Sequence, residues 1–136
     1  MYPADLVQPM REELTTQGFK ELQSKEDVDK FIQEKGTKLV VVNSVCGCAA
    51  ANARPGARAS LNNDKTPEKL ATVFAGVDGE ATEKARSYMA PFPPSSPSIA
   101  LFKDGELVHM LERHHIEGRA AEMIAENLKG AYDEYC

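Results

Sequence analysis

The sequence has only three cysteines, no tryptophan and no long apolar run. Three cysteines are too few for a scaffold held together by disulfides. No apolar run approaches the roughly 20 residues that a membrane-spanning helix needs. Residues 1–19 contain neither the basic region nor the apolar region of a signal peptide. We therefore expect a cytoplasmic protein that has no contact with a membrane.

Positive charge is also scarce, because the formal net charge is −5 and the isoelectric point is near 5.2. No basic cluster is longer than a dipeptide. Proteins that bind nucleic acid need clustered lysine and arginine to neutralise phosphates, so nucleic acid is excluded as a partner. A chain of 136 residues has the usual length of one domain and can bury one core. We therefore predict a single domain over residues 1–136.

Two of the cysteines, Cys46 and Cys48, are separated by one glycine, between an apolar run and an alanine-rich segment. In a cytoplasmic chain, such a close pair is typical of redox or metal chemistry rather than of a structural disulfide. We favour thiol–disulfide exchange. Two alternatives stay open: a soft-metal site, for which a third and fourth ligand are not obvious, and a pair of buried structural cysteines.

The hydrophobic pattern predicts two N-terminal helices followed by alternating strands and helices. Leu6, Val7, Met10 and Leu14 fall on one face of the first helix, and Ser24 with Asp27 resembles a capping box at the start of the second. A bend is expected at Pro55 and Gly56. We expect a loop over residues 112–118. The predicted helices cover residues 3–19, 25–36, 47–61, 80–89 and 117–132, and the predicted strands cover residues 37–45, 70–77, 98–102 and 107–111.

From residue 37 onward this order is β-α-β-α-β-β-α, with the cysteine pair where the first strand meets its helix. The order resembles the thioredoxin fold. Pro97 sharpens the resemblance, because thioredoxin-like proteins place a cis-proline immediately before the third strand, packed against the redox cysteines. We therefore expect an α/β protein with a four-stranded mixed central sheet flanked by helices. Residues 37–136 would form the thioredoxin-like core, and residues 1–36 an N-terminal helical extension.

The spacing Cys-Gly-Cys differs from the Cys-x-x-Cys of most thioredoxin-like proteins. Together with NSVCGCAAANARPGARAS, TVFAGVDGEAT, PSSPSIALFKDGELVHMLERHHIEG and the terminal Cys136, it resembles the bacilliredoxin family over nearly the whole chain. Bacilliredoxins are thiol-disulfide oxidoreductases that remove bacillithiol, a cysteine-containing sugar–malate thiol, from protein mixed disulfides. The resemblance implies this activity here, with Cys46 as the attacking cysteine and Cys48 as the second active-site cysteine.

The same resemblance implies which molecules take part in the reaction. No bound cofactor is expected, because bacillithiol itself would serve as the thiol co-substrate. Bacillithiolated proteins would be the substrates, and a NADPH-dependent flavin disulfide reductase would regenerate bacillithiol.

The residues around the pair support redox chemistry independently of the family. A thiolate at a helix N-terminus is stabilised by free amide groups and the helix dipole, so the pKa of Cys46 should fall. Gly47 should let the backbone close a small, strained and easily reduced ring between the two cysteines. A cis Ser96–Pro97 bond would put the Ser96 backbone beside the cysteines, as support for the site.

Two departures from thioredoxin argue that Cys48 reacts slowly. Val45 stands where thioredoxin has an aromatic residue, and Val40 stands where it has a buried carboxylate that helps to deprotonate the second cysteine. No internal base for Cys48 is visible. An external thiol should therefore resolve a mixed disulfide on Cys46.

Several other residues have a plainer interpretation than a functional one. We expect His114 and His115 to point apart in an exposed loop, and His109 to be a surface or partly buried histidine. Three arginines that could grip a malate are expected to be solvated charges, namely Arg54, Arg58 and Arg113. Cys136 is either an accessory thiol or a bystander. Besides de-bacillithiolation, the alternatives are protein disulfide isomerisation and a soft-metal-binding module that uses Cys46, Cys48 and a histidine.

Overall fold

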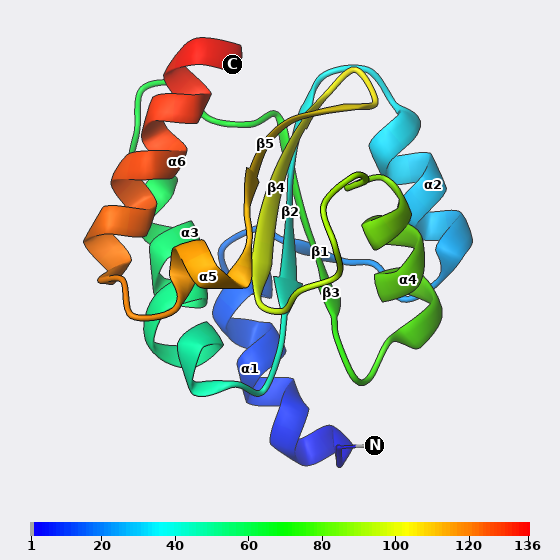
Figure 1. The fold of residues 1–136 in the computed structure, drawn as a ribbon. Helices are drawn as coiled ribbons and strands as arrows, with labels where there is room; N and C mark the ends of the chain where they lie inside the picture. The colour runs from blue at the N-terminus through cyan, green and yellow to red at the C-terminus, as the bar shows by residue number, and fades with distance from the viewer. Residues whose placement is uncertain (1) are drawn as a thin grey trace.

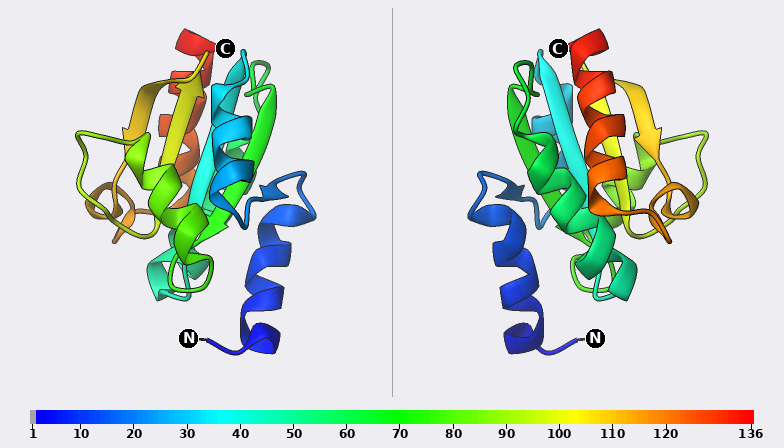
Figure 2. Two further views of the ribbon diagram at one scale, coloured as in Figure 1. Left: turned by 90° about the vertical axis from the view of Figure 1, so that its right-hand side faces the viewer. Right: turned by 90° about the vertical axis from the view of Figure 1, so that its left-hand side faces the viewer.

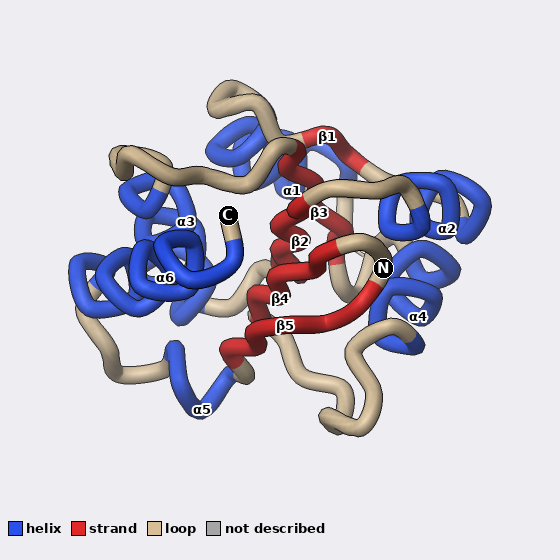
Figure 3. Tube along the Cα trace, turned by 90° about the horizontal axis from the view of Figure 1, so that it is seen from above, coloured by secondary structure: helices blue, strands red, loops and turns tan. Residues whose placement is uncertain are grey.

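A five-stranded mixed sheet with helices on both faces forms the protein, and the computed structural model describes residues 2–136. The elements are α1 (Ala4–Thr15), β1 (Lys20–Glu21), α2 (Lys25–Gln33), β2 (Thr37–Asn43), the π-helix η1 (Ala49–Ala53), α3 (Arg54–Ser60), β3 (Lys69–Phe74), α4 (Gly79–Ser87), β4 (Ser98–Lys103), β5 (Glu106–Leu111), α5 (Arg113–Ile116) and α6 (Ala121–Tyr135). Figure 1 labels these elements, and the strand order β1-β3-β2-β4-β5 can be followed from above in Figure 3. The thioredoxin-like fold class is confirmed.

Strand β2 lies at the centre of the sheet and is buried along its whole length. It pairs in parallel with β3 and antiparallel with β4. Its continuous run of β-branched and aliphatic residues suits a strand that is covered on both faces. The predicted doubly buried strand is therefore confirmed, and it places the following residues, including Cys46, at one end of the sheet.

Alternate residues of β2 face two separate cores. Leu39 and Val41 belong to the cluster that contains residues of α3 and α6, whereas Val40 and Val42 belong to the cluster that contains residues of α2 and α4. This alternation follows from the period of two in a strand. Figures 2 and 3 show the resulting layers, with α2 and α4 on one side of the sheet and α3 and α6 on the other.

The sheet has five strands rather than the expected four. The additional strand is β1, whose Lys20 and Glu21 pair in parallel with Ala71 and Thr72 of β3. A strand of two residues has no period that a sequence pattern could show, and its partner lies about fifty positions further along the chain. A division of the chain at residue 36 stays a prediction.

The first two helices are present, with differences in which residues they bury. Ser24 caps α2 as predicted, since its hydroxyl accepts a hydrogen bond from the Asp27 amide at 3.1 Å. On α1, Val7 and Leu14 are buried, but Leu6 is 47% exposed and Arg11 is buried. The buried apolar stripe is therefore narrower than predicted. Arg11 is buried because its guanidinium pairs with the Asp78 carboxylate.

Of two local predictions near the site, the bend at Pro55 and Gly56 stays a prediction, and the loop over residues 112–118 is wrong in part. The helix that starts at Gly47 passes into the π-helical segment η1, and α3 follows directly. Pro55 lies in the first turn of α3. A proline is well tolerated there because first-turn amides have no helical acceptor. The expected loop over residues 112–118 contains the short helix α5, which begins after Glu112.

Helices α3 and α6 approach closely at Gly56. A Cβ atom at position 56 would lie 2.6 Å from Ile124 Cγ2 and 3.3 Å from the Ala121 carbonyl oxygen. Glycine is therefore required here for the contact between the active-site helix and the last helix.

We predict that Gly56→Ala lowers the free energy of unfolding by about 1–3 kcal/mol, because the added methyl group pushes α6 away from α3. Urea denaturation measures this change. The matched control is Gly130→Ala within α6, where a Cβ would meet nothing within 4 Å. That variant should be more stable than the parent by about 0.5–1 kcal/mol. A Gly56→Ala protein as stable as the parent would contradict the close helix contact.

Candidate active site

Cys46 lies at the N-terminus of the helical segment that follows β2. Its carbonyl accepts hydrogen bonds from the amides of Ala49 at 2.9 Å and Ala50 at 3.2 Å. The Cys48 amide lies 3.4 Å from Cys46 Sγ and donates to it. Cys46 thus lies at the helix N-terminus, as predicted, where the Cys48 amide faces its sulfur.

The two cysteines are joined by a disulfide, with their Cα atoms 5.3 Å apart. Cys46 is half-buried, whereas Cys48 is only 8% exposed. A large substrate can therefore reach Cys46 more easily than Cys48. Gly47 is exposed and a Cβ there would meet nothing within 4 Å, so its backbone role stays a prediction.

A buried guanidinium holds the turn that leads from β2 to Cys46. Arg54 is 1% exposed, and its Nη1 donates to Asn43 Oδ1 and to the Ser44 carbonyl, both at 2.9 Å. Its Nε lies 3.1 Å from Glu13 Oε1. The expectation that Arg54 is a solvated charge is therefore wrong, because the first turn of α3 faces the end of β2.

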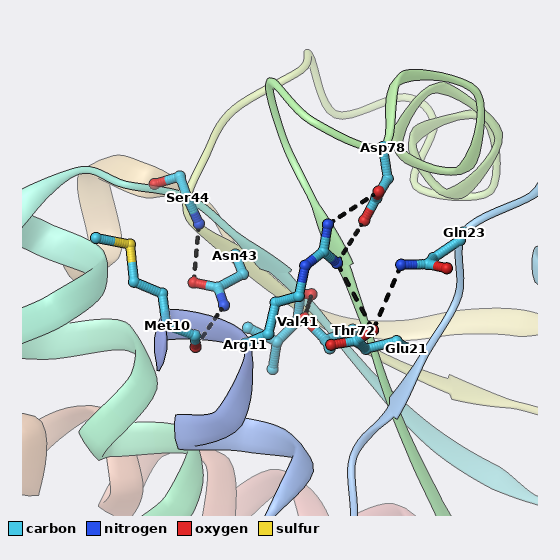
Figure 4. A network of polar contacts seen from close by, with 9 residues as sticks. All are labelled: Met10, Arg11, Glu21, Gln23, Val41, Asn43, Ser44, Thr72 and Asp78. Atoms are coloured by element: carbon cyan, nitrogen blue, oxygen red, sulfur yellow. Dashed lines mark hydrogen bonds and ion pairs between the residues drawn. The ribbon is translucent and has the colours of Figure 1, made fainter. Parts of the chain in front are cut away.

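The same turn is tied to helix α1. Asn43 Nδ2 donates to the Met10 carbonyl at 3.2 Å, and the Ser44 amide donates to Asn43 Oδ1 at 2.9 Å (Figure 4). One Asn43 side chain therefore connects α1, the active-site turn and, through Arg54, helix α3.

A second arginine fixes α1 to the start of α4. Arg11 Nη1 and Nη2 donate to the two Asp78 carboxylate oxygens at 2.8 and 3.1 Å (Figure 4). The hydrogen bond to Asp78 raises the pKa of Arg11, against the opposing effect of burial. Helix α1 is therefore bonded to two of the turns at this end of the sheet.

The segment before β4 lies beside Cys46. The Ser96–Pro97 peptide bond is cis, as predicted from the sequence. The Ser96 carbonyl accepts a hydrogen bond from Arg113 Nη1 at 3.3 Å, and the Ser95 carbonyl accepts one from Arg86 Nη2 at 3.4 Å. Two arginines from different helices thus bind consecutive carbonyls of this segment.

Arg113 also reaches the Cys46 sulfur. Its Nη2 lies 3.5 Å from Cys46 Sγ, and its Nε donates to Glu117 at 2.9 Å. Although exposed, Arg113 is therefore more than a solvated charge. Arg58, by contrast, is exposed as predicted. The sequence named Arg113 only as an arginine expected to be solvated, because its contact with Cys46 depends on α5, in a segment that we expected to be a loop.

Cys46 lines an open cavity of about 480 Å³. Arg86 is a lining residue that the sequence analysis missed. The walls also come from the turn after β2, the turn after β3 and the Ser96 segment. The lining residues are Tyr2, Ser44, Val45, Cys46, Ala75, Gly76, Arg86, Ser96 and Arg113.

The histidines lie outside this cavity. His114 and His115 do not point apart, since their ring centroids are 4.0 Å apart, and both rings approach Glu112. The reason is that the His115 ring turns back toward Glu112, where its Nδ1 accepts a hydrogen bond from the Glu112 amide at 3.0 Å. Among residues 2–136, this trio is the group that could hold a metal, and it includes neither Cys46 nor Cys48. His109 is partly buried, as expected, and pairs with Asn127.

Cys136 lies at the other end of β2, near Thr37. The residue is exposed, but nearby protein atoms desolvate its sulfur and raise the pKa of the thiol. Cys136 therefore lacks the features that would activate a nucleophile.

Comparison with known proteins gives a consistent result. The chain matches the Disulphide isomerase family over residues 2–136. It is 61% identical to the bacilliredoxin of Cytophaga hutchinsonii, covering 98% of this chain and 99% of that protein. It is 55% identical to bacilliredoxin BH1716 of Halalkalibacterium halodurans, covering 99% of this chain and 94% of that protein.

Among solved structures, a mutant thioredoxin from Halobacterium salinarum superimposes with a TM-score of 0.61 at 18% identity, covering 88% of this chain and 91% of that one. Mitochondrial thioredoxin 3 from Saccharomyces cerevisiae has a TM-score of 0.56 at 13% identity, with 90% and 98% covered. These likenesses concern the fold. Within the described residues, no helix has the length and apolar character needed to cross a membrane.

The contacts of Cys46 generate a prediction about its acidity. With Cys48→Ala and Cys136→Ala as background, the midpoint of Cys46 alkylation against pH should fall below about 8, because helix amides and a cation stabilise the thiolate. Adding Arg113→Gln should raise that midpoint by about one unit. Arg58→Gln, which removes an exposed arginine, should not move it. A midpoint at or above about 8.5 in the background protein would show that Cys46 is not activated.

The raised pKa of Cys136 generates a second prediction, on relative reactivity. In the fully reduced protein at pH 7, iodoacetamide should label Cys46 well before Cys136, because a raised thiol pKa leaves less thiolate at a given pH. Labelling of Cys136 should rise only as the pH approaches its pKa. Peptide mass mapping after timed labelling measures both, and equal rates at pH 7 would contradict the assignment.

Proposed function

Because the chain belongs to the bacilliredoxin family of thiol-disulfide oxidoreductases, which remove bacillithiol from protein mixed disulfides, we propose that Cys46 accepts the bacillithiol and that Cys48 is the second active-site cysteine. The observation that carries these roles is the position of Cys46. Its sulfur is accessible, receives an amide hydrogen bond and lies 3.5 Å from a guanidinium nitrogen. Cys48 is buried behind it.

The first step is a thiol–disulfide exchange. The Cys46 thiolate attacks the bacillithiol sulfur of the mixed disulfide, a new Cys46–bacillithiol disulfide forms, and the client cysteine leaves as a thiolate. The helix amides and Arg113 stabilise the attacking thiolate before the step. Because one disulfide replaces another, no net oxidation or reduction takes place.

The second step releases bacillithiol from Cys46. A free bacillithiol thiolate attacks the adduct, which regenerates the Cys46 thiolate and yields bacillithiol disulfide. A NADPH-dependent flavin disulfide reductase then supplies two electrons to reduce that product. We place these reactions in the cytoplasm, where structural disulfides are rare and mixed disulfides need removal.

Cys48 offers a second route for release. Its thiolate can attack Cys46 in the adduct, which frees bacillithiol and leaves the Cys46–Cys48 disulfide present in this structure. Cys48 is buried, and apolar Val40 occupies the position at which thioredoxin carries a carboxylate. We therefore propose that the external thiol provides the faster route.

Ser96 and Pro97 are proposed to position the substrate. A client backbone that lies along this segment would find the Ser96 carbonyl already bound by Arg113. The amide of Ser96 is then the group that remains for pairing with the client.

Protein disulfide isomerisation is a second candidate, favoured by the name of the matching family. It would use the same Cys46 attack, but on a disulfide within a client. Recovery of activity from a scrambled disulfide protein tests isomerisation, and recovery from a bacillithiolated protein tests the first proposal.

The division of labour predicts different effects for the two cysteines. Cys46→Ala should abolish adduct formation with a bacillithiolated protein, because the attacking sulfur is gone. Cys48→Ala should still take up bacillithiol and should release it to excess free bacillithiol. Intact mass spectrometry follows both events, and loss of both activities in Cys48→Ala alone would reverse the assigned roles.

A further inference from the structure

The cavity at Cys46 is positively charged in a protein that carries a net charge of −5. Of the described residues that line it, two are arginines and none is a carboxylate. Positive groups concentrated around a reactive sulfur attract anionic substrates.

Arg86 is the less satisfied of these two arginines. Its Nε is buried and has no hydrogen-bond partner in the described structure, and its Nη2 has only a long contact of 3.4 Å with the Ser95 carbonyl. None of the ion pairs formed by residues 2–136 involves Arg86. Desolvation lowers its pKa, as expected of a cation without a counter-ion. A partly buried guanidinium costs free energy unless an anion or acceptors complete it.

Arg113 approaches the same segment from another helix. Arg86 on α4 binds the Ser95 carbonyl and Arg113 on α5 binds the Ser96 carbonyl, so the two arginines line the same cavity as Cys46, and Arg113 contacts its sulfur. Arg113 is partly neutralised by Glu117, which leaves Arg86 as the stronger anion site.

We propose that Arg86 and Arg113 form a carboxylate-binding subsite that holds the malate of bacillithiol while its sulfur is attacked by Cys46. This inference rests on the proposed function. Malate carries carboxylates, and the planar fork of arginine binds a carboxylate through two parallel hydrogen bonds. The cavity volume of about 480 Å³ is within the usual range for a small-molecule site.

The subsite would determine which thiol the protein removes. Exchange depends on the substrate sulfur, whereas binding of malate depends on groups remote from that sulfur. A small thiol that lacks carboxylates should therefore still react with Cys46, but more slowly. Arg86 is the residue to test, because Arg113 also contacts Cys46 and its loss would change the thiolate itself.

The experiment compares two substrates in the Cys48→Ala protein. One is a peptide mixed disulfide with bacillithiol, and the other is the same peptide joined to the cysteinyl-glucosamine that lacks malate. Intact mass spectrometry or stopped-flow fluorescence gives the rate of transfer to Cys46. The Cys48→Ala protein, the parent for the variants below, should transfer bacillithiol about ten times faster than the thiol without malate. That is the ratio that one charge-assisted hydrogen-bonded pair supplies.

Arg86→Gln should reduce this preference to nearly one by slowing only the malate-containing substrate. Arg86→Lys, which keeps the charge without the fork, should give an intermediate ratio, and the exposed control Arg58→Gln should keep the full ratio. The ratio is internal to each protein, so a general loss of folded protein does not change it.

Free malate provides a test that needs no variant. In the parent protein, it should slow transfer from the bacillithiol substrate more than sodium chloride does at equal ionic strength. A parent protein with no preference, an unchanged preference in Arg86→Gln, or equal slowing by malate and chloride would overturn the subsite. Absence of any Cys46 adduct with either substrate would instead refute the proposed function.

Discussion

The turn that carries Cys46 depends on one buried cation, the guanidinium of Arg54. Burying such a group is unfavourable unless acceptors surround it, so the Asn43 side chain and the Ser44 carbonyl are held in one arrangement. The Cys46 amide in turn donates to the Ser44 hydroxyl at 3.3 Å. The direction of the helix N-terminus toward the Cys46 sulfur therefore follows from a polar network that lies beneath the site and takes no part in the chemistry.

Around this turn, the polar contacts of the Cys46 sulfur come from the surface rather than from the core. Val40 and Val42 face an apolar cluster, whereas the positive groups come from a helix terminus and from Arg113 on α5. A core carboxylate would assist the second cysteine, but cations at the surface assist the first. This arrangement suits a protein that exchanges one small thiol at a time and leaves later steps to a diffusing thiol.

Local signals in the sequence predicted the features whose causes are local. The doubly buried β2 and the Ser24 cap of α2 each follow from a few adjacent residues, whereas the cis bond before Pro97 was expected from the resemblance to the thioredoxin fold. Strand β1 could not be predicted, because its two residues are ordered by pairing with β3. The burial of Arg54 and the contact of Arg113 with Cys46 depend on segments that meet only in the folded chain. The cysteine pair could be located from the sequence, whereas the charged groups beside it could not.

The position of Cys136 determines which disulfides it can form. Cys136 lies near Thr37, the first residue of β2, and Cys46 follows the last, so a seven-residue strand of about 20 Å separates the two cysteines. A disulfide requires Cα atoms less than about 7 Å apart. Within one folded molecule, Cys136 therefore cannot reach Cys46. Any disulfide between them under oxidative conditions must join two molecules, so that a covalent dimer on a non-reducing gel reports the meeting of separate chains.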